Sequence, residues 1–487
     1  MRVVISMRLA YFVLISVGFF SAISCDQLRG GEDVYGVWTA EDSLDGAPYK
    51  HVLQLDTQGQ RLVVSTIATY LDYPVKMQFD TASFNGDSVH LWSNNPRVKD
   101  TFKGKWGGDV IVGEFMRNGQ RRKVTFHRFD LKARRPQTPI RPFPYVEQEV
   151  RFANCDSSVV FGGTLTYPDA KKRFPAVLLI SGAFPHDRDG TAFYHKPYLV
   201  IADYLTRHGF AVLRLDDRNV GKTVEVRGAK VDFVDDALCA IEFLRQHENV
   251  DRDHIGLVGH SQGGMIAMEA AAANSDVAAV VTLGSPISIP GTDYFVNHHA
   301  SLLTGMPHSS KEKVVGLMTE ILLTIKETPS KRIAADLVME KAKAWFQHNR
   351  DDDEALSAFL LTPDDARDEK AIGRMLEQGF GYYFSRDHYY ILSYEPDSVI
   401  PKVKCPILAV YGGHDNRVNY LKGRRRLESL VGRSGTVLQT KFFENMNHSL
   451  QTSTGKDDTE IFELDETVSP ELLELLKDWL TKRLNAD

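Results

Sequence analysis

Short segments rich in β-branched and aromatic residues alternate with turn-forming residues between positions 33 and 130. Apolar and polar positions alternate along part of each segment, which is the two-residue period of a strand. The segments are 52–55, 62–66, 75–79, 89–92, 110–112 and 124–126. Pairs such as Asn85-Gly86 and Asn118-Gly119 between them are typical of tight hairpin turns. We therefore expect a small antiparallel β barrel or sandwich over residues 25–131.

The next segment, residues 132–145, predicts a linker between two domains. It is basic, and four of the nine residues from 136 to 144 are prolines. Such a composition favours an extended, semi-rigid chain without a core of its own.

Residues 146–487 show a different pattern, in which buried strands alternate with amphipathic helices. Nearly continuous apolar runs occur at 176–180, 211–215, 255–258, 278–283 and 407–411. Helical patterns cover about 197–208, 231–247 and 262–274. Strands of this kind belong to a mostly parallel sheet with helices on both faces.

The stretch from about 291 to 400 interrupts this rhythm with amphipathic helical patterns, and a hundred residues are too many for a loop. We expect a helical lid, with a capping box at Ser309–Glu312 before one of its helices. A final helix should begin with Ser469 as N-cap and Pro470 as its first residue.

Composition narrows the range of functions. Hydrophobic residues make up 43% of the 487 residues, enough for large cores, and the formal net charge is −6 without long runs of one sign. A nucleic-acid partner requires a concentrated basic face, so this charge distribution argues against one.

The first 24 residues predict an export signal peptide. Arg2 and Arg8 precede a dozen apolar residues, and Ala22 and Ser24 suit a cleavage site. Cys25 follows the cut directly, as in a bacterial lipoprotein box, although Ala22 stands where that box usually has leucine. We expect a periplasmic or cell-envelope protein, with membrane attachment through a lipidated Cys25 as one form and a retained N-terminal anchor as the lesser alternative.

Three further cysteines, Cys155, Cys239 and Cys405, are expected to be buried free thiols rather than a disulfide framework.

The most informative motif is Gly259-His260-Ser261-Gln262-Gly263, between an apolar strand and an Ala-rich helix. A serine in such a sharp strand-to-helix turn is exposed at the top of the sheet, and the flanking glycines leave room for the turn. Chance alone produces this pattern in some chains, but the strand and helix around it favour a nucleophile over an ordinary loop.

A serine nucleophile needs a base and an acid that orients the base, and in this kind of sheet they follow the serine in the order acid, then histidine. Asp415 lies in the turn after the strand at 407–411. His448 follows the next strand-like segment, 437–443. Alone, each has an ordinary interpretation as a turn former or surface residue. The conjunction predicts a Ser261–His448–Asp415 triad.

The oxyanion site should combine the backbone N–H of Gln262 with one from the loop that follows the strand at 176–180. Ala183 is the preferred second donor, with Gly182 beside it. The charged residues 187–189 of this loop either touch the substrate or brace the loop as an ion pair.

With these motifs the chain resembles the α/β-hydrolase superfamily, and within it exported bacterial two-domain esterases, serine aminopeptidase-like hydrolases with a small N-terminal β domain. The resemblance rests on the segments 181–190, 215–223, 259–264, 404–408 and 445–448. It implies an α/β-hydrolase fold with a helical lid insertion. Two departures are Ala183-Phe184 for the usual small pair and Asn219 for a glycine; the first would narrow the acyl pocket.

Three functions remain open at this point. The leading hypothesis is a carboxylesterase that cleaves small acyl esters through an acyl-enzyme on Ser261. A serine peptidase or aminopeptidase with the same triad is the second, and a catalytically inert envelope binding protein is the third. No metal or cofactor is expected, because no cluster of ligands stands at metal-binding spacing. Substrate specificity and oligomeric state cannot be derived from these patterns.

Overall fold

The computed structural model describes residues 34–44, 47–58, 61–67, 79, 81–92, 101–117, 120–129, 135–192, 194–303, 305–359, 361, 363–455 and 460–484. The predicted signal peptide and Cys25 lie outside them. The described residues form two compact units, 34–129 and 135–484, and each is presented by itself.

The N-terminal unit is one antiparallel sheet of eight strands, which curves as a half-barrel rather than forming a two-sheet sandwich. The strands are β1 (Gly36–Leu44), β2 (Ala47–Gln58), β3 (Arg61–Ile67), β4 (Thr81–Asn85), β5 (Ser88–Trp92), β6 (Thr101–Trp106), β7 (Val110–Arg117) and β8 (Gln120–Phe129). Their order is β3-β2-β1-β8-β7-β6-β5-β4. Its core is aromatic: Trp38, Phe102 and Phe126 are fully buried, and the last two meet edge to face at 5.2 Å.

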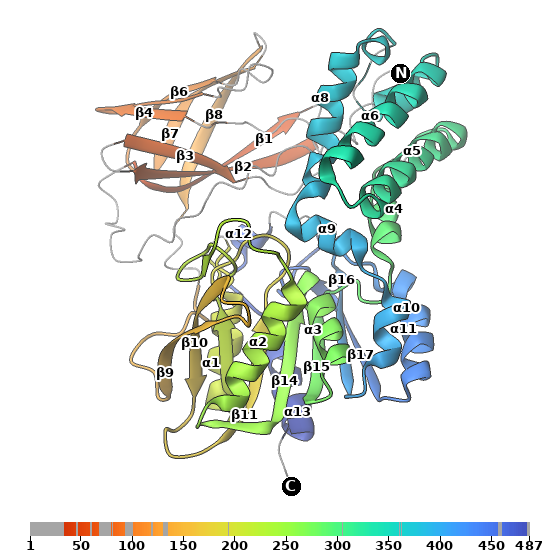
Figure 1. Ribbon diagram of the computed structural model, residues 1–487. Coiled ribbons are helices and arrows are strands. Elements are labelled where there is room, and N and C mark those ends of the chain that lie inside the picture. Colours follow the sequence, from red (N-terminus) through yellow and green to blue (C-terminus); the bar gives the residue numbers. More distant parts are fainter. Residues whose placement is uncertain are drawn as a thin grey trace. The chain divides into compact units, whose positions relative to one another are not determined.

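The C-terminal unit is built on a mixed sheet. Its strands are β9 (Val146–Ala153), β10 (Val159–Tyr167), β11 (Phe174–Ile180), β12 (Ala211–Leu215), β13 (Val224–Glu225), β14 (Val250–His260), β15 (Val277–Leu283), β16 (Ile407–His414) and β17 (Leu438–Asn447). The main order is β9-β10-β12-β11-β14-β15-β16-β17, and the short β13 also pairs with β10. β10 is antiparallel to its neighbours, and all pairs from β12 to β17 are parallel (Figure 1).

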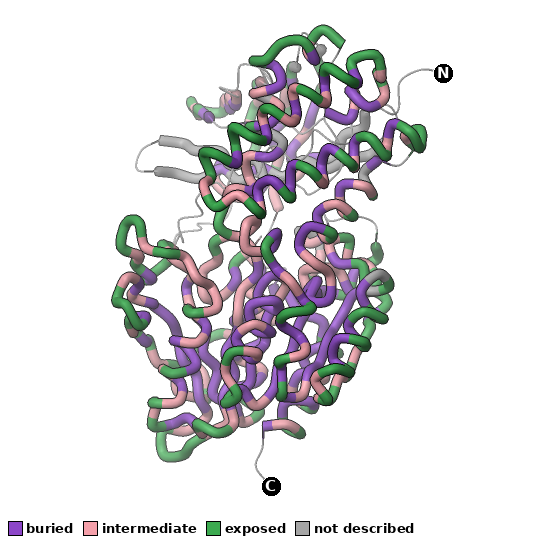
Figure 2. The backbone as a smooth tube through the Cα atoms, turned by 45° about the vertical axis from the view of Figure 1, so that its right-hand side comes forward, coloured by how far each residue is buried: buried purple, intermediate pink, exposed green. Residues whose placement is uncertain are grey.

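Both faces of this sheet are covered, so its central strands are apolar on both sides. Along β11, Val177 and Leu179 join the core beneath α1 (Pro197–Arg207) and α13 (Pro470–Leu484). Ala176 and Leu178 join the opposite core, beneath α2 (Phe233–Gln246), α3 (Gln262–Ala273) and α11 (Tyr420–Ser434). Figure 2 shows the strands as a continuous buried layer.

Between β15 and β16 the chain forms a helical insertion at one end of the sheet (Figure 1). Its helices are α4 (Gly291–Leu302), α5 (His308–Glu327), α6 (Lys331–His348), α7 (Asp353–Ser357), α8 (Glu369–Phe380), α9 (Arg386–Ser393) and α10 (Pro396–Val399), with short 3-10 turns at 365–367, 381–384 and 400–402. A further short helix, α12 (Glu460–Glu463), precedes α13.

The linker and one of the thiols differ from the sequence-based expectations. The segment from Arg135 onward, assigned above to a linker, belongs to the C-terminal unit: Arg135 is buried, and the Gln137 side chain hydrogen-bonds the backbone of Thr467 and Val468. Of the three thiols, Cys239 and Cys405 are free and buried as expected, whereas Cys155 is exposed because it lies in the turn between β9 and β10.

Candidate active site

The turn between β14 and α3 holds Ser261 in a strained conformation with φ 54° and ψ −120°. The backbone passes too close to itself for side chains on either side of the serine. A Cβ on Gly259 would lie 2.1 Å from the carbonyl oxygen of Gly263, and one on Gly263 would lie 2.3 Å from that of Ile180. The two glycines therefore permit the sharp turn that raises Ser261 above the sheet.

Backbone hydrogen bonds fix the position of Ser261. Its N–H donates to the carbonyl oxygen of Leu283 on β15 at 2.9 Å, and its own carbonyl accepts from the Ser285 hydroxyl at 2.6 Å. Ser261 is the N-cap residue of α3 but makes no side-chain cap, so its hydroxyl is available for other partners.

The structure brings the three residues of the predicted triad together. The Oγ of Ser261 lies 3.2 Å from Nε2 of His448, and Nδ1 of His448 lies 2.9 Å from Oδ2 of Asp415. The three side chains come from the ends of β14, β16 and β17. A histidine held in this way has the correct tautomer to accept a proton from the serine.

Asp415 is placed to remain charged. Its side chain is almost fully buried, which alone would raise its pKa, but the nearby His448 and the backbone N–H groups of Val418 and Arg417 lower the pKa below its ordinary value. Those two N–H groups donate to Oδ1 at 2.9 and 2.8 Å, leaving Oδ2 for the histidine. A carboxylate is therefore available to orient the imidazole and stabilise its charge.

His260, whose role the sequence does not predict, links the loop of His448 to the loop after β11. Its Nε2 lies 2.8 Å from the backbone carbonyl of His448 and its Nδ1 lies 3.3 Å from the hydroxyl of Tyr198, which accepts the N–H of Gly182. Burial, and then the neighbouring His448, lower its pKa to about 3. His260 is thus neutral at ordinary pH and supports the His448 loop as a hydrogen-bond donor.

The loop after β11 lies against the nucleophile, because a Cβ on Gly182 would be 3.3 Å from the Cβ of Ser261. The N–H of Gly182 is engaged by Tyr198. No acceptor occurs for the N–H of Ala183 within the part of the chain that the structure describes. Gln262 is the first residue of α3, so its N–H has no acceptor within the helix. The geometry thus favours Ala183 over Gly182 as the loop's donor.

Two partly buried acidic side chains lie against this loop. Asp217, which follows β12, accepts the Ser181 hydroxyl and the N–H of His186, both at 2.7 Å. Burial raises the pKa of the Asp387 carboxyl, on α9 of the insertion, and the nearby N–H of Phe184 lowers it in part. Phe184 has a φ of 77°, a conformation that a side-chain-bearing residue keeps only when its surroundings impose it.

The insertion also contacts the nucleophile turn. The side chain of Gln262 donates to the backbone carbonyl of Asp387 at 3.1 Å, and the Phe184 ring lies 5.4 Å from the His388 ring. Burial lowers the pKa of His388 to about 4, so this imidazole is neutral at ordinary pH. Helix α9 therefore contacts both the nucleophile turn and the loop after β11, which supply the candidate oxyanion donors.

Comparisons with known proteins find hydrolases among the proteins similar to this chain. The family described as "Serine aminopeptidase, S33" matches residues 189–352, which include Ser261 but neither Asp415 nor His448. Esterase EstD of Thermotoga maritima is 23% identical over 322 residues, and the match covers 66% of this chain and 65% of that esterase. The strands β9 to β17 have the order of an α/β hydrolase, with the serine after β14, the acid after β16 and the histidine after β17.

The chain has the fold of the α/β-hydrolase superfamily.

Solved structures with a similar fold include an esterase of Pyrococcus furiosus, at 11% identity and a TM-score of 0.40, with 72% of this chain and 97% of that chain covered. An α/β hydrolase of a Penicillium species has 16% identity and a TM-score of 0.39, with 70% of this chain and 99% of that chain covered. The match with the Thermotoga maritima esterase spans less than two thirds of that esterase's own length.

The charged residues 187–189 brace the loop after β11 rather than point to a substrate. The Arg188 guanidinium pairs with Asp216 at 2.6 Å, and Asp189 pairs with the buried Arg214. Asp187 accepts the N–H and the hydroxyl of Thr191, at 2.8 and 2.7 Å. These pairs explain the run of charges in the sequence as a structural feature.

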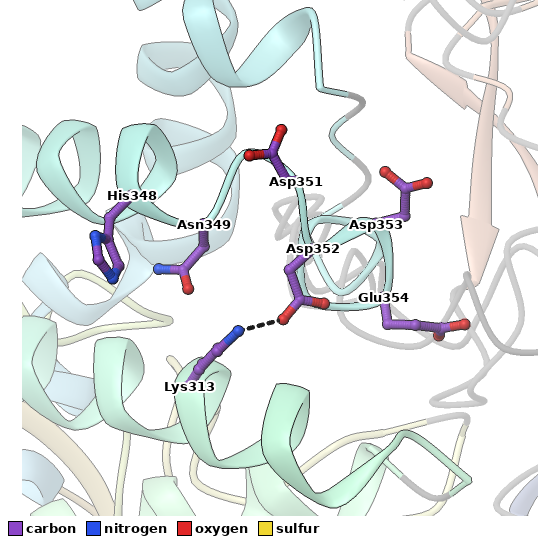
Figure 3. A pocket seen from close by; sticks show the side chains of 7 residues that line it. All are labelled: Lys313, His348, Asn349, Asp351, Asp352, Asp353 and Glu354. Carbon is purple, nitrogen blue, oxygen red and sulfur yellow. Dashed lines mark hydrogen bonds and ion pairs between the residues drawn. The ribbon is translucent and has the colours of Figure 1, made fainter.

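A hollow of about 490 Å³ lies elsewhere, at the junction of α5, α6 and α7 (Figure 3). It is acidic, but Asp352 already binds Lys313 and caps α7 through the N–H of Ala355. Asp351 and Asp353 point away from Lys313 in Figure 3. Among the described residues, no group of histidine, cysteine or acidic side chains is arranged to hold a metal ion, and no helix is long and apolar enough to cross a membrane.

Proposed function

We propose that this α/β hydrolase is a carboxylesterase that cleaves small acyl esters through a covalent acyl-enzyme on Ser261. The observation that carries the proposal is the continuous chain of contacts from Ser261 Oγ to His448 Nε2 and from His448 Nδ1 to the Asp415 carboxylate. Such a chain converts an unreactive hydroxyl into a nucleophile at neutral pH.

In the first half of the proposed reaction, Ser261 attacks the ester carbonyl carbon while His448 accepts the serine proton. The N–H groups of Gln262 and Ala183 stabilise the oxyanion that forms. His448 then returns the proton to the departing alcohol. In the second half, His448 removes a proton from water, which attacks the acyl carbon; His448 then gives that proton to Ser261 Oγ as the bond to the acyl group breaks and the acid leaves.

The test is hydrolysis of short p-nitrophenyl esters by the wild type and by Ser261→Ala. We expect the substitution to lower kcat by at least about 10³-fold, because no other group supplies the nucleophile. Ser449→Ala, which changes the serine beside His448, is the matched control and should retain activity. An unchanged rate in Ser261→Ala would refute the acyl-enzyme mechanism.

A peptidase that uses the same triad is the second candidate, and the description of the matching family as a serine aminopeptidase favours it. Turnover of aminoacyl-arylamides and of simple esters at equal concentration separates the two. We expect a higher kcat/KM for the esters. Preference for the arylamides would make the protein a peptidase and leave the triad assignment intact.

Export is a separate proposal that rests on residues 1–25. Cleavage after Ser24 in a bacterial host, with or without a lipid on Cys25, would support it. The mass of the mature N-terminal peptide measures both features. A mature chain that keeps Met1 or the apolar segment at residues 9–20 would contradict the proposed cleavage.

A further inference from the structure

The hairpin of β9 and β10 packs on helix α2 through a group of aromatic rings. Phe152 on β9 stacks on Phe243 of α2, with ring centroids 4.4 Å apart and ring planes inclined by 10°. Phe152 also contacts Phe161 on β10 at 5.4 Å. These contacts fix the distance between the hairpin and the helix.

Hydrogen bonds also hold the turn of this hairpin. Asn154 accepts the N–H of Val159 on its side-chain oxygen at 2.9 Å, and its backbone carbonyl accepts the N–H of Ser157 at 3.0 Å. Cys155 follows Asn154, so the direction of its side chain is set by this turn.

Cys239 lies on α2 four positions before Phe243, and positions four apart lie on the same face of a helix. The helix therefore presents the thiol of Cys239 to the same hairpin that Phe243 contacts. The two sulfur atoms, of Cys155 and Cys239, are 3.3 Å apart. A disulfide bond is about 2.05 Å long, and small side-chain rotations supply the difference.

We propose that Cys155 and Cys239 are a redox-active pair, which forms an intramolecular disulfide when the folded protein meets a small-molecule or protein disulfide. The proposal does not depend on the esterase activity. The third described thiol, Cys405, is buried in the core at the entry to β16 and is not part of the pair.

The exposure of the two thiols determines which of them reacts first with an external disulfide. Cys155 is exposed, whereas burial, and then the contact with Cys155, raise the pKa of the Cys239 thiol to about 12. With oxidised glutathione, the Cys155 thiolate attacks one sulfur, forms a mixed disulfide and releases one glutathione thiol. Cys239 then gives its proton to solvent, attacks the Cys155 sulfur and releases the second glutathione. Two protein thiols are oxidised to one disulfide, and one glutathione disulfide is reduced to two thiols.

The bridge would join two positions that are 84 residues apart. It would fasten an outer hairpin of the sheet to a helix that covers its face. Closing a loop of this length restricts the unfolded chain strongly, so the oxidised protein should be the more stable form.

Incubation of the folded protein with oxidised glutathione, followed by alkylation and tryptic peptide mapping, tests the proposal. We expect a disulfide between the peptides 152–171 and 231–245, together with a rise in Tm of roughly 5–10 °C that dithiothreitol reverses. Cys155→Ser should show neither effect, and Cys405→Ser should show both. Because Cys155 is exposed, its substitution leaves the cores intact.

Cys239→Ala tests the order of the steps. This variant should accumulate one glutathione on Cys155, because the resolving thiol is absent, whereas Cys155→Ser should leave Cys239 unmodified. The proposal is overturned if wild-type protein keeps glutathione on Cys155 without forming the linked peptides. It is equally overturned if Cys239 remains fully alkylated after oxidation, or if the only disulfides join two chains.

Discussion

At the scale of single residues, the site depends on strain that the fold imposes on Ser261. A serine with φ 54° and ψ −120° costs on the order of 1–3 kcal/mol, and the turn keeps it because the backbones of residues 259, 263 and 180 meet without side chains between them. The strained backbone places Oγ next to the His448 ring. The fold therefore keeps a reactive geometry that lowers the stability of the turn.

Asp415→Asn should lower kcat for ester hydrolysis by about 10³–10⁴-fold, because the amide cannot stabilise a charged imidazole and favours the wrong histidine tautomer. The Oδ1 contacts with the N–H groups of Arg417 and Val418 can be kept by the amide oxygen, so the fold should survive. Steady-state kinetics with circular dichroism as a fold check measures this, and the exposed Asp478→Asn is the control. A loss below tenfold would contradict the assigned role.

The raised pKa of Asp217 predicts that the free energy of unfolding depends on pH. Burial raises its pKa to about 7, against an ordinary value of 3.8, so between these pH values the folded chain holds a proton that the unfolded chain has lost. Its contribution to the free energy of unfolding therefore falls as the pH rises through this window, by up to about 1.4 kcal/mol per pH unit, and is constant above it. Asp217→Asn should remove that slope.

Urea unfolding of the wild type and Asp217→Asn at several pH values between 4.5 and 8 measures the difference. The amide also weakens the contacts to Ser181 and His186, so the variant should be less stable throughout. The prediction concerns only the change in the free energy of unfolding with pH. Equal slopes in both proteins would show that Asp217 is charged in the fold.

The sequence alone predicts Ser261, Asp415 and His448, because each follows an apolar strand and the order of the three is fixed by the sheet. His260 and Asp387 could not be predicted in their present roles. His260 acts through Tyr198, 62 positions away, and Asp387 contacts a loop about 200 positions before it. Contacts of this kind depend on tertiary packing and leave no local pattern.

At the scale of elements, the helical insertion takes part in the construction of the site. Helix α9 contacts Phe184 through the His388 ring, and it accepts a hydrogen bond from the Gln262 side chain on the Asp387 carbonyl. The existence of helices here was predictable from their apolar periodicity, but one of their boundaries was not. The capping box at Ser309–Glu312 was wrong, because α5 already begins at His308, after Pro307, and Ser310 instead binds Asp352.

Asp387→Ala should lower kcat by about tenfold or more with a smaller change in KM, because the loop at Phe184 loses the acidic side chain that lies near its N–H. Hydrogen exchange of the segment 181–190 should become faster in the same variant. Asp364→Ala, a change at a highly exposed position of the insertion, is the matched control. Unchanged kinetics and exchange would mean that the loop keeps its position without α9.

At the scale of the whole molecule, the chain consists of two units with separate cores. The Pro-rich composition predicts a boundary in this region, but composition cannot reveal that Arg135 and Gln137 hydrogen-bond the residues before α13. Those contacts are made with segments more than 300 positions away. They make residues 135–145 an integral part of the hydrolase unit.

A truncated protein that begins at Arg135 should therefore fold and retain ester hydrolysis, whereas one that begins at Val146 should be less stable. The shorter protein loses the buried Arg135, the Gln137 hydrogen bonds and the Tyr145 contact with Asp203. Thermal unfolding of the two proteins, with p-nitrophenyl ester turnover, measures the difference. Equal Tm values would place the functional boundary later, near residue 146.

The central claim is that Ser261 is an activated nucleophile, and covalent labelling with a fluorophosphonate tests it most directly. The account predicts one probe molecule per chain, bonded to Ser261 Oγ with loss of fluoride, and no labelling of Ser261→Ala under the same conditions. Labelling should be slowed strongly in His448→Ala, which keeps the serine but removes its base. A folded wild-type protein that does not react, or a Ser261→Ala variant that still does, would contradict the account.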